Sequence, residues 1–240
     1  MKKSIIISIQ PQWVEKILNG EKTIEIRKSI PKCELPIDVY IYCSKSGDNL
    51  YKVIKEHYEL FSGAVAEPFD SRIGLELTKE KLYKKYRENT DNGFSDVFTN
   101  LLNGKIVAKF TLNTVEEIFY KKFPNGVGYY HIFTCDSILC VEKNSRLNEF
   151  DLLSYLKPKE KDCMCGYAWH IDNLEIFDKP MELNQFYKGN YEQIIDHLQI
   201  VGCDSCYCPH LTDNGCDIMY CPSLKIKKAF QSWGYAYKEE

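Results

Sequence analysis

The N-terminal part of the chain alternates between hydrophobic and polar positions in short blocks. Residues 4–10 alternate with a period of two, which predicts a strand. Pro11 suits the first turn of a helix, and residues 13–18 place apolar side chains on one helical face. Gly20 then provides a natural helix end. The sequence therefore predicts a strand followed directly by a short helix.

Residues 22–28 return to strict alternation and predict a second strand. Because successive side chains of a strand point to opposite faces, Ile24 and Ile26 should lie on one face. Glu25 and Arg27 should share the other face, close enough to form an ion pair.

The remaining segments predict short strands that are far apart in the sequence. Further strands are expected at 37–45, 105–115, 166–177 and 231–237, and helices within 49–103 and at 147–156. This pattern favours an α+β fold, a small mixed β-barrel with flanking helices, over a doubly wound sheet. We expect one domain over 1–240, with a helical insertion at about 49–103 and a cysteine-rich insertion at about 187–229.

Composition and charge exclude several classes of protein. The chain has 240 residues, 44% of them hydrophobic, which is typical of a globular protein rather than a disordered one. With 31 basic and 34 acidic residues its net charge is −3, so any nucleic-acid binding must come from a local patch. No apolar run approaches the roughly 18 residues of a membrane span, and the N-terminal apolar stretch is too short for a signal peptide. We expect a cytoplasmic protein that has no contact with membranes.

Eleven cysteines are unusual for such a chain, and an odd number cannot all form intramolecular disulfides. Five of them crowd into 203–221, among glycines and prolines. Two close pairs of soft ligands suit a tetrahedral, structural zinc site. The expected ligands are Cys203, Cys206, Cys216 and Cys221, with Cys208 and His210 as alternates. An iron–sulfur cluster or metal-free thiols are the other interpretations. We expect ordinary reduced thiols at Cys33, Cys43, Cys135 and Cys140, whereas Cys163 and Cys165 are either further reduced thiols or neighbours of the metal site.

Aromatic residues on the predicted strands allow two interpretations. They are Tyr40, Tyr42, Trp169, Trp233, Tyr235 and Tyr237. Such side chains either stack nucleobases or fill the core of a small barrel. We expect core packing for Trp169 and a structural role for His170, and we leave both interpretations open for Trp233.

The second predicted strand carries the spacing Gly-x-Lys-x-x-Glu-x-Arg, at Gly20, Lys22, Glu25 and Arg27. This spacing resembles the signature of the ASCH domain, a member of the PUA-like superfamily of β-barrels. Segments on the other predicted strands resemble the larger, phage-type ASCH proteins, so that the resemblance covers roughly half of the chain.

From the residues alone, a carboxylate beside two cations is either a solvated surface ion pair or a site for a polar, planar ligand such as a nucleobase edge. The resemblance favours the second, because ASCH domains are inferred to bind RNA or nucleotide-like ligands in a cleft beside this motif. The expected ligand-binding residues are Lys22, Thr23, Glu25, Arg27, Ser44, Lys45 and Trp233. The expected partner is RNA, a nucleotide or a modified nucleoside.

Two other functions stay open. Some small ASCH proteins are amidohydrolases that deacylate N4-acetylcytidine; their lysine matches Lys22, but Glu25 stands where they have a catalytic threonine. A hydrolase acting on such nucleosides, or on RNA, would use Lys22 and Glu25 as its acid and base. The third hypothesis is a phage-encoded interaction protein that binds a host protein or a signalling nucleotide.

Overall fold

The computed structural model describes residues 2–45, 50, 102–122, 130–134, 141–160, 162–188, 211–212, 215–216 and 224–238. The helical insertion predicted within 49–103 and most of the cysteine-rich insertion lie outside these residues. Both stay predictions, as does the single domain.

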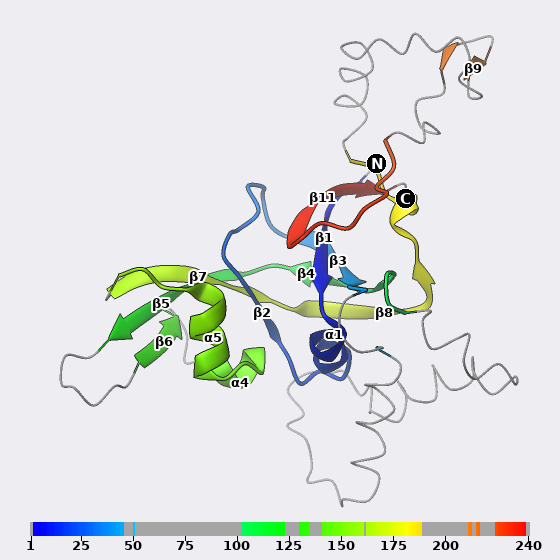
Figure 1. Cartoon of the computed structure of the whole chain (residues 1–240). Helices are drawn as coiled ribbons and strands as arrows, with labels where there is room; N and C mark the ends of the chain where they lie inside the picture. Colours follow the sequence, from blue (N-terminus) through cyan, green and yellow to red (C-terminus); the bar gives the residue numbers. More distant parts are fainter. Residues whose placement is uncertain are drawn as a thin grey trace, which may run out of the picture.

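Strands dominate the described residues, and helices are few and short (Figure 1). The strands are β1 (Lys2–Ile9), β2 (Ile24–Arg27), β3 (Ile37–Cys43), β4 (Ile106–Leu112), β5 (Val115–Lys122), β6 (Tyr130–Thr134), β7 (Asp162–His170), β8 (Asp172–Met181), β9 (Leu211–Thr212), β10 (Gly215–Cys216) and β11 (Trp233–Lys238). The helices are α1 (Pro11–Leu18), α4 (Val141–Ser145), α5 (Glu149–Leu156) and the 3₁₀ turn η2 (Leu183–Gln185). The predicted α+β class is confirmed.

The strands form a five-stranded sheet in the order β11-β1-β3-β4-β8, a four-stranded sheet in the order β2-β7-β5-β6, and the small pair β10-β9. Within the two larger sheets only β1 and β3 run parallel, and every other neighbour is antiparallel. The chain crosses between these sheets before and after β2, at 113–114, and again at Ile171. The strand predicted at 166–177 is therefore two strands, one in each sheet. Among the described residues the two sheets stay open and do not close into one hydrogen-bonded cylinder.

The main core lies on one face of the five-stranded sheet, under α1. Ile5 and Ile7 of β1 pack there with Val14 and Ile17 of α1, and all four are at most 1% exposed. Pro11 occupies the first turn of α1, as predicted, and Gly20 follows the helix with a φ of +79°, in the left-handed region where glycine is favoured. This packing fixes where β2 begins.

A second core joins β2 to α4 and α5. Ile24 and Ile26 of β2 pack against Leu152 and Leu156 of α5, as the predicted alternation requires. Ala168 of β7 completes this contact. The opposite side of β2, which carries Glu25 and Arg27, is left to face a cavity. No helix in the described part of the chain is both long and apolar enough to cross a membrane.

Candidate functional site

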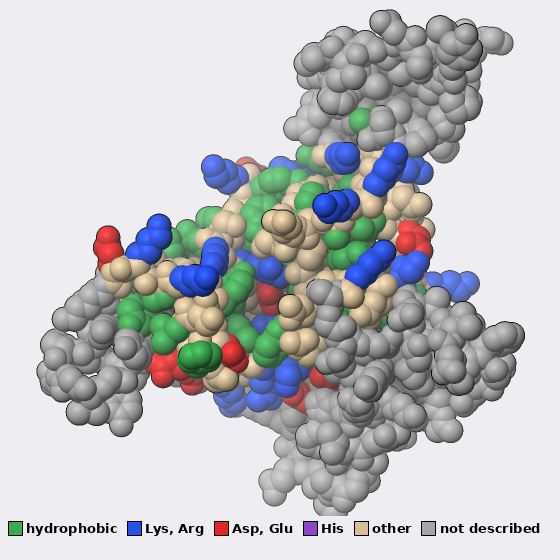
Figure 2. All heavy atoms as spheres, viewed as in Figure 1, with side chains coloured by type: hydrophobic (Ala, Val, Ile, Leu, Met, Phe, Trp, Pro, Cys, Tyr) green, Lys and Arg blue, Asp and Glu red, His purple; other side chains and the backbone are tan. Residues whose placement is uncertain are grey.

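A cavity of about 440 Å³ opens between the start of α1, β2 and α5. We call it the first cavity. Its lining consists of Ser8, Ile9, Gln10, Gln12, Trp13, Lys22, Glu25, Ile26, Arg27, Leu147, Asp151, Tyr155 and Gln231. Figure 2 shows a hollow in this face with basic and acidic side chains in its floor and hydrophobic ones beside it.

The three charged residues of the motif meet in this cavity. Glu25 bridges the two cations: its Oε2 lies 3.2 Å from Lys22 Nζ, and its Oε1 lies 3.0 Å from Arg27 Nη2. The three residues are 2%, 8% and 7% exposed for Lys22, Glu25 and Arg27. The prediction that Glu25 and Arg27 share a face is confirmed, and Lys22 joins them from the turn before β2.

Backbone and hydroxyl groups from other elements hold the two cations in place. Lys22 Nζ donates to the Ser145 carbonyl at the end of α4, over 2.8 Å. Arg27 donates through Nη2 to the Ser8 carbonyl of β1 over 3.0 Å and through Nη1 to Ser232 Oγ over 3.1 Å. Arg27 Nε is buried without a hydrogen-bond partner among the described residues. The charged cluster therefore ties β2 to α4, β1 and the start of β11 as well as lining the cavity.

Burial changes the acid–base character of Lys22. Loss of solvent around its ammonium group lowers the pKa of Lys22 below its usual 10.5, and the nearby carboxylate of Glu25 offsets only part of this effect. The ammonium group of Lys22 is held by Glu25 and the Ser145 carbonyl, which offset part of the cost of burying it.

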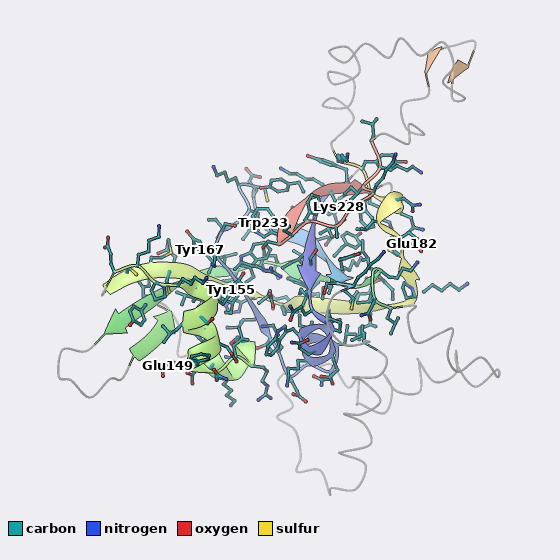
Figure 3. All side chains as sticks on the ribbon, in the orientation of Figure 1. Glu149, Tyr155, Tyr167, Glu182, Lys228 and Trp233 are labelled. Carbon is teal, nitrogen blue, oxygen red and sulfur yellow. The ribbon has the colours of Figure 1, made fainter. Side chains whose placement is uncertain are left out.

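Two aromatic side chains stand in the cavity wall. Trp13 lies on α1, with Lys22 Nζ 5.9 Å from the centroid of its ring. Tyr155 lies on α5, is 38% exposed, and has Lys28 Nζ 5.2 Å from its ring centroid. Figure 3 labels Tyr155 on the helix that borders the cavity. A polar floor between aromatic rings is an arrangement that can accept a flat, hydrogen-bonding ligand.

A larger cavity of about 590 Å³ lies next to the first one, and the two share Ser8 and Gln231 in their linings. We call it the second cavity. It is lined by Ser8, Tyr42, Ser44, Lys45, Gly104, Glu182, Leu183, Asn184, Ile226, Lys227, Lys228, Ala229, Phe230 and Gln231.

The other predicted ligand-binding residues do not join the cluster. Ser44 and Lys45 line the second cavity. Trp233 lines neither cavity: it is half-buried, its Nε1 donates to Ser29 Oγ over 3.1 Å, and its ring centroid is 5.5 Å from that of Trp169. Thr23 also lines neither cavity, and its backbone N–H donates to the Asn144 carbonyl over 2.9 Å.

Sequence reasoning missed the residues that surround the motif in space. Trp13, Tyr155 and Gln231 line the first cavity, and Lys227 and Lys228 line the second. An aromatic residue on each of the two helices that flank a motif strand is a signal that was present in the sequence. The lysine pair gives no such signal, because contacts between distant parts of the chain bring it to the cavity: Ile226 N–H donates to the Phe186 carbonyl, and β11 pairs with β1.

The structural residues behave as predicted where they are described. Trp169 is fully buried in the main core. His170 Nε2 lies 3.2 Å from Glu116 Oε2 and lines neither cavity. Cys33 and Cys43 are free thiols, and burial raises the pKa of Cys43 to about 12.

The predicted zinc ligands lie outside the residues whose side chains the structure describes, as do Cys208 and His210. Within the described residues no group of three or more His, Cys, Asp or Glu side chains is arranged to hold a metal ion. Structural zinc at the cysteine cluster stays a prediction.

Comparison with known proteins adds little to this geometry. No protein-family model matches the chain, and no curated protein does. Solved structures similar to it include an ASCH protein from Zymomonas mobilis and a tyrosine-to-phenylalanine variant of an ASCH protein from the same organism. The first is 12% identical with a TM-score of 0.34, covering 80% of this chain and 77% of the other. The variant is 11% identical with a TM-score of 0.36, covering 76% and 77%.

Both structures carry the name of the family that the motif at 20–27 resembles. At these scores the likeness carries no argument about the site, whose chemistry rests on the residues of this chain alone.

Proposed function

We propose that this protein binds a nucleobase of an RNA strand or of a free nucleotide in the first cavity. The observation that carries the proposal is the buried Lys22–Glu25–Arg27 cluster lying in a cavity whose walls include Trp13 and Tyr155.

The chemistry of this cavity suits an uncharged, flat ligand. Its two cations, Lys22 and Arg27, are matched by two carboxylates, Glu25 and Asp151, so the formal charge of the lining sums to zero. Glu25 and the glutamine amides of the wall offer acceptors and donors to the edge of a base. Aromatic rings stack bases whatever their sequence, at about 1–3 kcal/mol for each base.

The proposal is tested by substituting Tyr155→Ala and measuring the affinity for the four ribonucleosides and for a mixed-sequence RNA hexamer. Tyr155 is partly exposed, so its loss should leave the fold intact while weakening binding roughly tenfold, which corresponds to about 1.4 kcal/mol of lost stacking.

Phe150→Ala is the matched control, because Phe150 lies on the same helix, is 78% exposed and does not line the cavity. Equal affinities of the Tyr155→Ala and Phe150→Ala variants would contradict the proposal. Absence of binding by the unmodified protein would contradict it as well.

A hydrolase acting on modified nucleosides or RNA is the second candidate, and the lowered pKa of Lys22 favours it. A lysine whose pKa is lowered by burial gives up its proton more readily than an exposed lysine, which favours a role as a general acid or base. Incubation with N4-acylated cytidines and with RNA, followed by mass spectrometry and gel analysis, tests this function. Product formation that is abolished by Lys22→Met would support it, and intact substrates would rule it out for these compounds.

A further inference from the structure

The second cavity differs from the first in charge. Three lysines, Lys45, Lys227 and Lys228, line it, against one carboxylate, Glu182. That carboxylate is paired with Lys105, whose Nζ contacts Glu182 Oε1. Within the described part of the chain no carboxylate lies at ion-pair distance from any of the three lysines. Among the described residues, the lining of the second cavity therefore carries an excess of positive charge, whereas the charges in the lining of the first cavity cancel.

Figure 3 places Lys228 and Glu182 near one another, on the side of β1 away from Tyr155 and α5 in this view. Figure 2 shows several basic side chains on this side of the face, and others at its left and lower edges. The linings of the two cavities place the excess of positive charge in the second one, although the whole chain has a net charge of −3.

Lys45 has a defined position in the second cavity. A methyl group added at Gly104 would lie 2.6 Å from Lys45 Cε and 3.1 Å from Lys45 Cγ, so the stem of the lysine crosses directly over this glycine. Gly104 also has a φ of +82°, which strains other residues. The glycine allows the close approach that holds the Lys45 stem against the cavity wall.

Ser8 lies between the two cavities and is hydrogen-bonded to the wall of each. Its carbonyl accepts from Arg27 Nη2 of the first cavity, and its hydroxyl donates to the Phe230 carbonyl in the wall of the second over 2.6 Å. A ligand that spans both cavities would therefore pass a wall whose groups are already fixed by hydrogen bonds.

We propose that the second cavity binds a phosphate group of the same nucleotide or RNA strand whose base occupies the first cavity. This inference rests on the proposed function. Lysine ammonium groups bind phosphate oxygens as point charges, and phosphate contacts position a strand while base contacts select its sequence. A neutral cavity beside a cationic one matches a ligand with an uncharged base and a charged backbone.

The test compares the unmodified protein with a Lys227→Ala/Lys228→Ala variant. Affinities are measured for a ribonucleoside, its 5′- and 3′-monophosphates and a mixed-sequence RNA hexamer between 50 and 200 mM KCl. The variant should bind the nucleoside as before and should bind the phosphate-bearing ligands more weakly. For the hexamer, loss of two phosphate contacts should make the slope of log affinity against log salt less negative by about 1.4. The unmodified protein should accordingly lose about sevenfold more affinity than the variant over this range.

Lys143→Ala/Lys159→Ala is the charge-matched control, since both lysines are exposed and line neither cavity. The ligand set also shows which phosphate occupies the second cavity. If the variant loses affinity for a monophosphate, the cavity binds the phosphate of the same nucleotide; if it loses affinity for the hexamer alone, the cavity binds the phosphate of a neighbouring nucleotide. Gly104→Ala should displace Lys45. It is expected to lower the affinity for the phosphate-bearing ligands by a smaller factor than the Lys227→Ala/Lys228→Ala variant does, and to leave the affinity for the nucleoside unchanged.

The outcomes separate the two proposals. Nucleoside binding with equal hexamer affinities and salt slopes for the lysine variant and its control would overturn the phosphate site and leave the base site standing. Hexamer binding that depends on Lys227 and Lys228, without nucleoside binding or any effect of Tyr155→Ala, would support the phosphate site and overturn the base site. Binding of neither ligand would overturn both.

Discussion

Lys22 is the most buried of the three charged residues in the cluster with Glu25 and Arg27. It is 2% exposed, and its ammonium group is held by Glu25 Oε2 and by the Ser145 carbonyl. A buried ion pair contributes little net stability compared with apolar residues of the same shape, but removing one partner leaves an uncompensated charge. Glu25 would keep Arg27 as a partner if Lys22 were replaced, so a Lys22→Met variant should still fold.

The stability contributed by Lys22 should depend on pH in a defined direction. Its folded-state pKa lies below the usual 10.5, so between these two values the unfolded chain binds more protons than the folded one. The free energy of unfolding of the native protein should therefore rise with pH toward about 10.5, relative to a Lys22→Met variant, and level off above it. Urea denaturation of both proteins from pH 7 to 11 measures this difference.

Buried tyrosines such as Tyr40 and Tyr42, whose pKa values are raised, also make the free energy of unfolding depend on pH. Because they are present in both proteins, their contribution cancels in the difference between the native protein and the Lys22→Met variant. Lys143→Met, at an exposed position, provides the control and should give a difference that does not vary with pH. A difference that stays flat or falls for Lys22→Met would show that burial does not destabilise the charged form of Lys22.

At the scale of elements, the position of α5 on β7 decides where Tyr155 and Asp151 stand in the first cavity. Gly166 of β7 lies under the helix: a methyl group there would be 2.5 Å from Leu156 Cδ2 and 3.1 Å from the Arg27 carbonyl. Gly166→Ala should therefore force α5 outward and lower the free energy of unfolding by about 1–3 kcal/mol. Denaturant titration measures this loss, and a weaker affinity for RNA should accompany it.

A double-mutant cycle provides the control for this prediction. Leu156→Ala alone should cost about 2–5 kcal/mol through the space that it leaves. In the double variant the alanine at Gly166 would occupy part of that space, so the combined cost should be smaller than the sum. If the loss of unfolding free energy in the double variant equals the sum of the two single losses, the contact between Gly166 and Leu156 does not limit how closely α5 packs on β7.

The sequence anticipated the elements near the motif better than it anticipated the site as a whole. Alternation at 22–28 correctly separated Ile24 and Ile26, which pack in the second core, from Glu25 and Arg27, which line the first cavity, although Ile26 also reaches the lining of that cavity. Helix α5 was also predicted at nearly its observed bounds. These features depend on local periodicity, which a single sequence contains.

The division of the site into two cavities was not predictable in the same way. Ser44 and Lys45 follow β3, which runs parallel to β1, so they lie near Ser8 at the end of β1. They line the second cavity and not the first, where the motif residues lie. Trp233 begins β11 but opposes Ile7 of β1, and its ring packs on Trp169. These placements depend on which strands pair, and periodicity along the chain does not contain that information.

At the scale of the whole molecule, the residues on either side of the segment 189–223, of which the structure describes only 211–212 and 215–216, are hydrogen-bonded to each other. Lys188 N–H donates to the Leu224 carbonyl over 3.0 Å, and Tyr187 pairs with Tyr237 of β11 by two backbone hydrogen bonds of 2.9 and 3.0 Å. Because its two ends are already joined, replacing this segment should not pull the sheets apart. The predicted zinc ligands all lie within it.

We therefore expect the full chain, purified without added metal, to contain about one zinc ion, which a structural site of four cysteines would retain. A variant in which 190–222 is replaced by a short, flexible Gly-Ser linker should contain none and should still unfold cooperatively. Elemental analysis and denaturant titration measure the two properties, and Cys33→Ser, outside the segment, should keep its metal. A full chain without zinc would show that the cysteine cluster holds free thiols or another metal. A shortened chain that fails to fold would instead show that the two sheets depend on this segment.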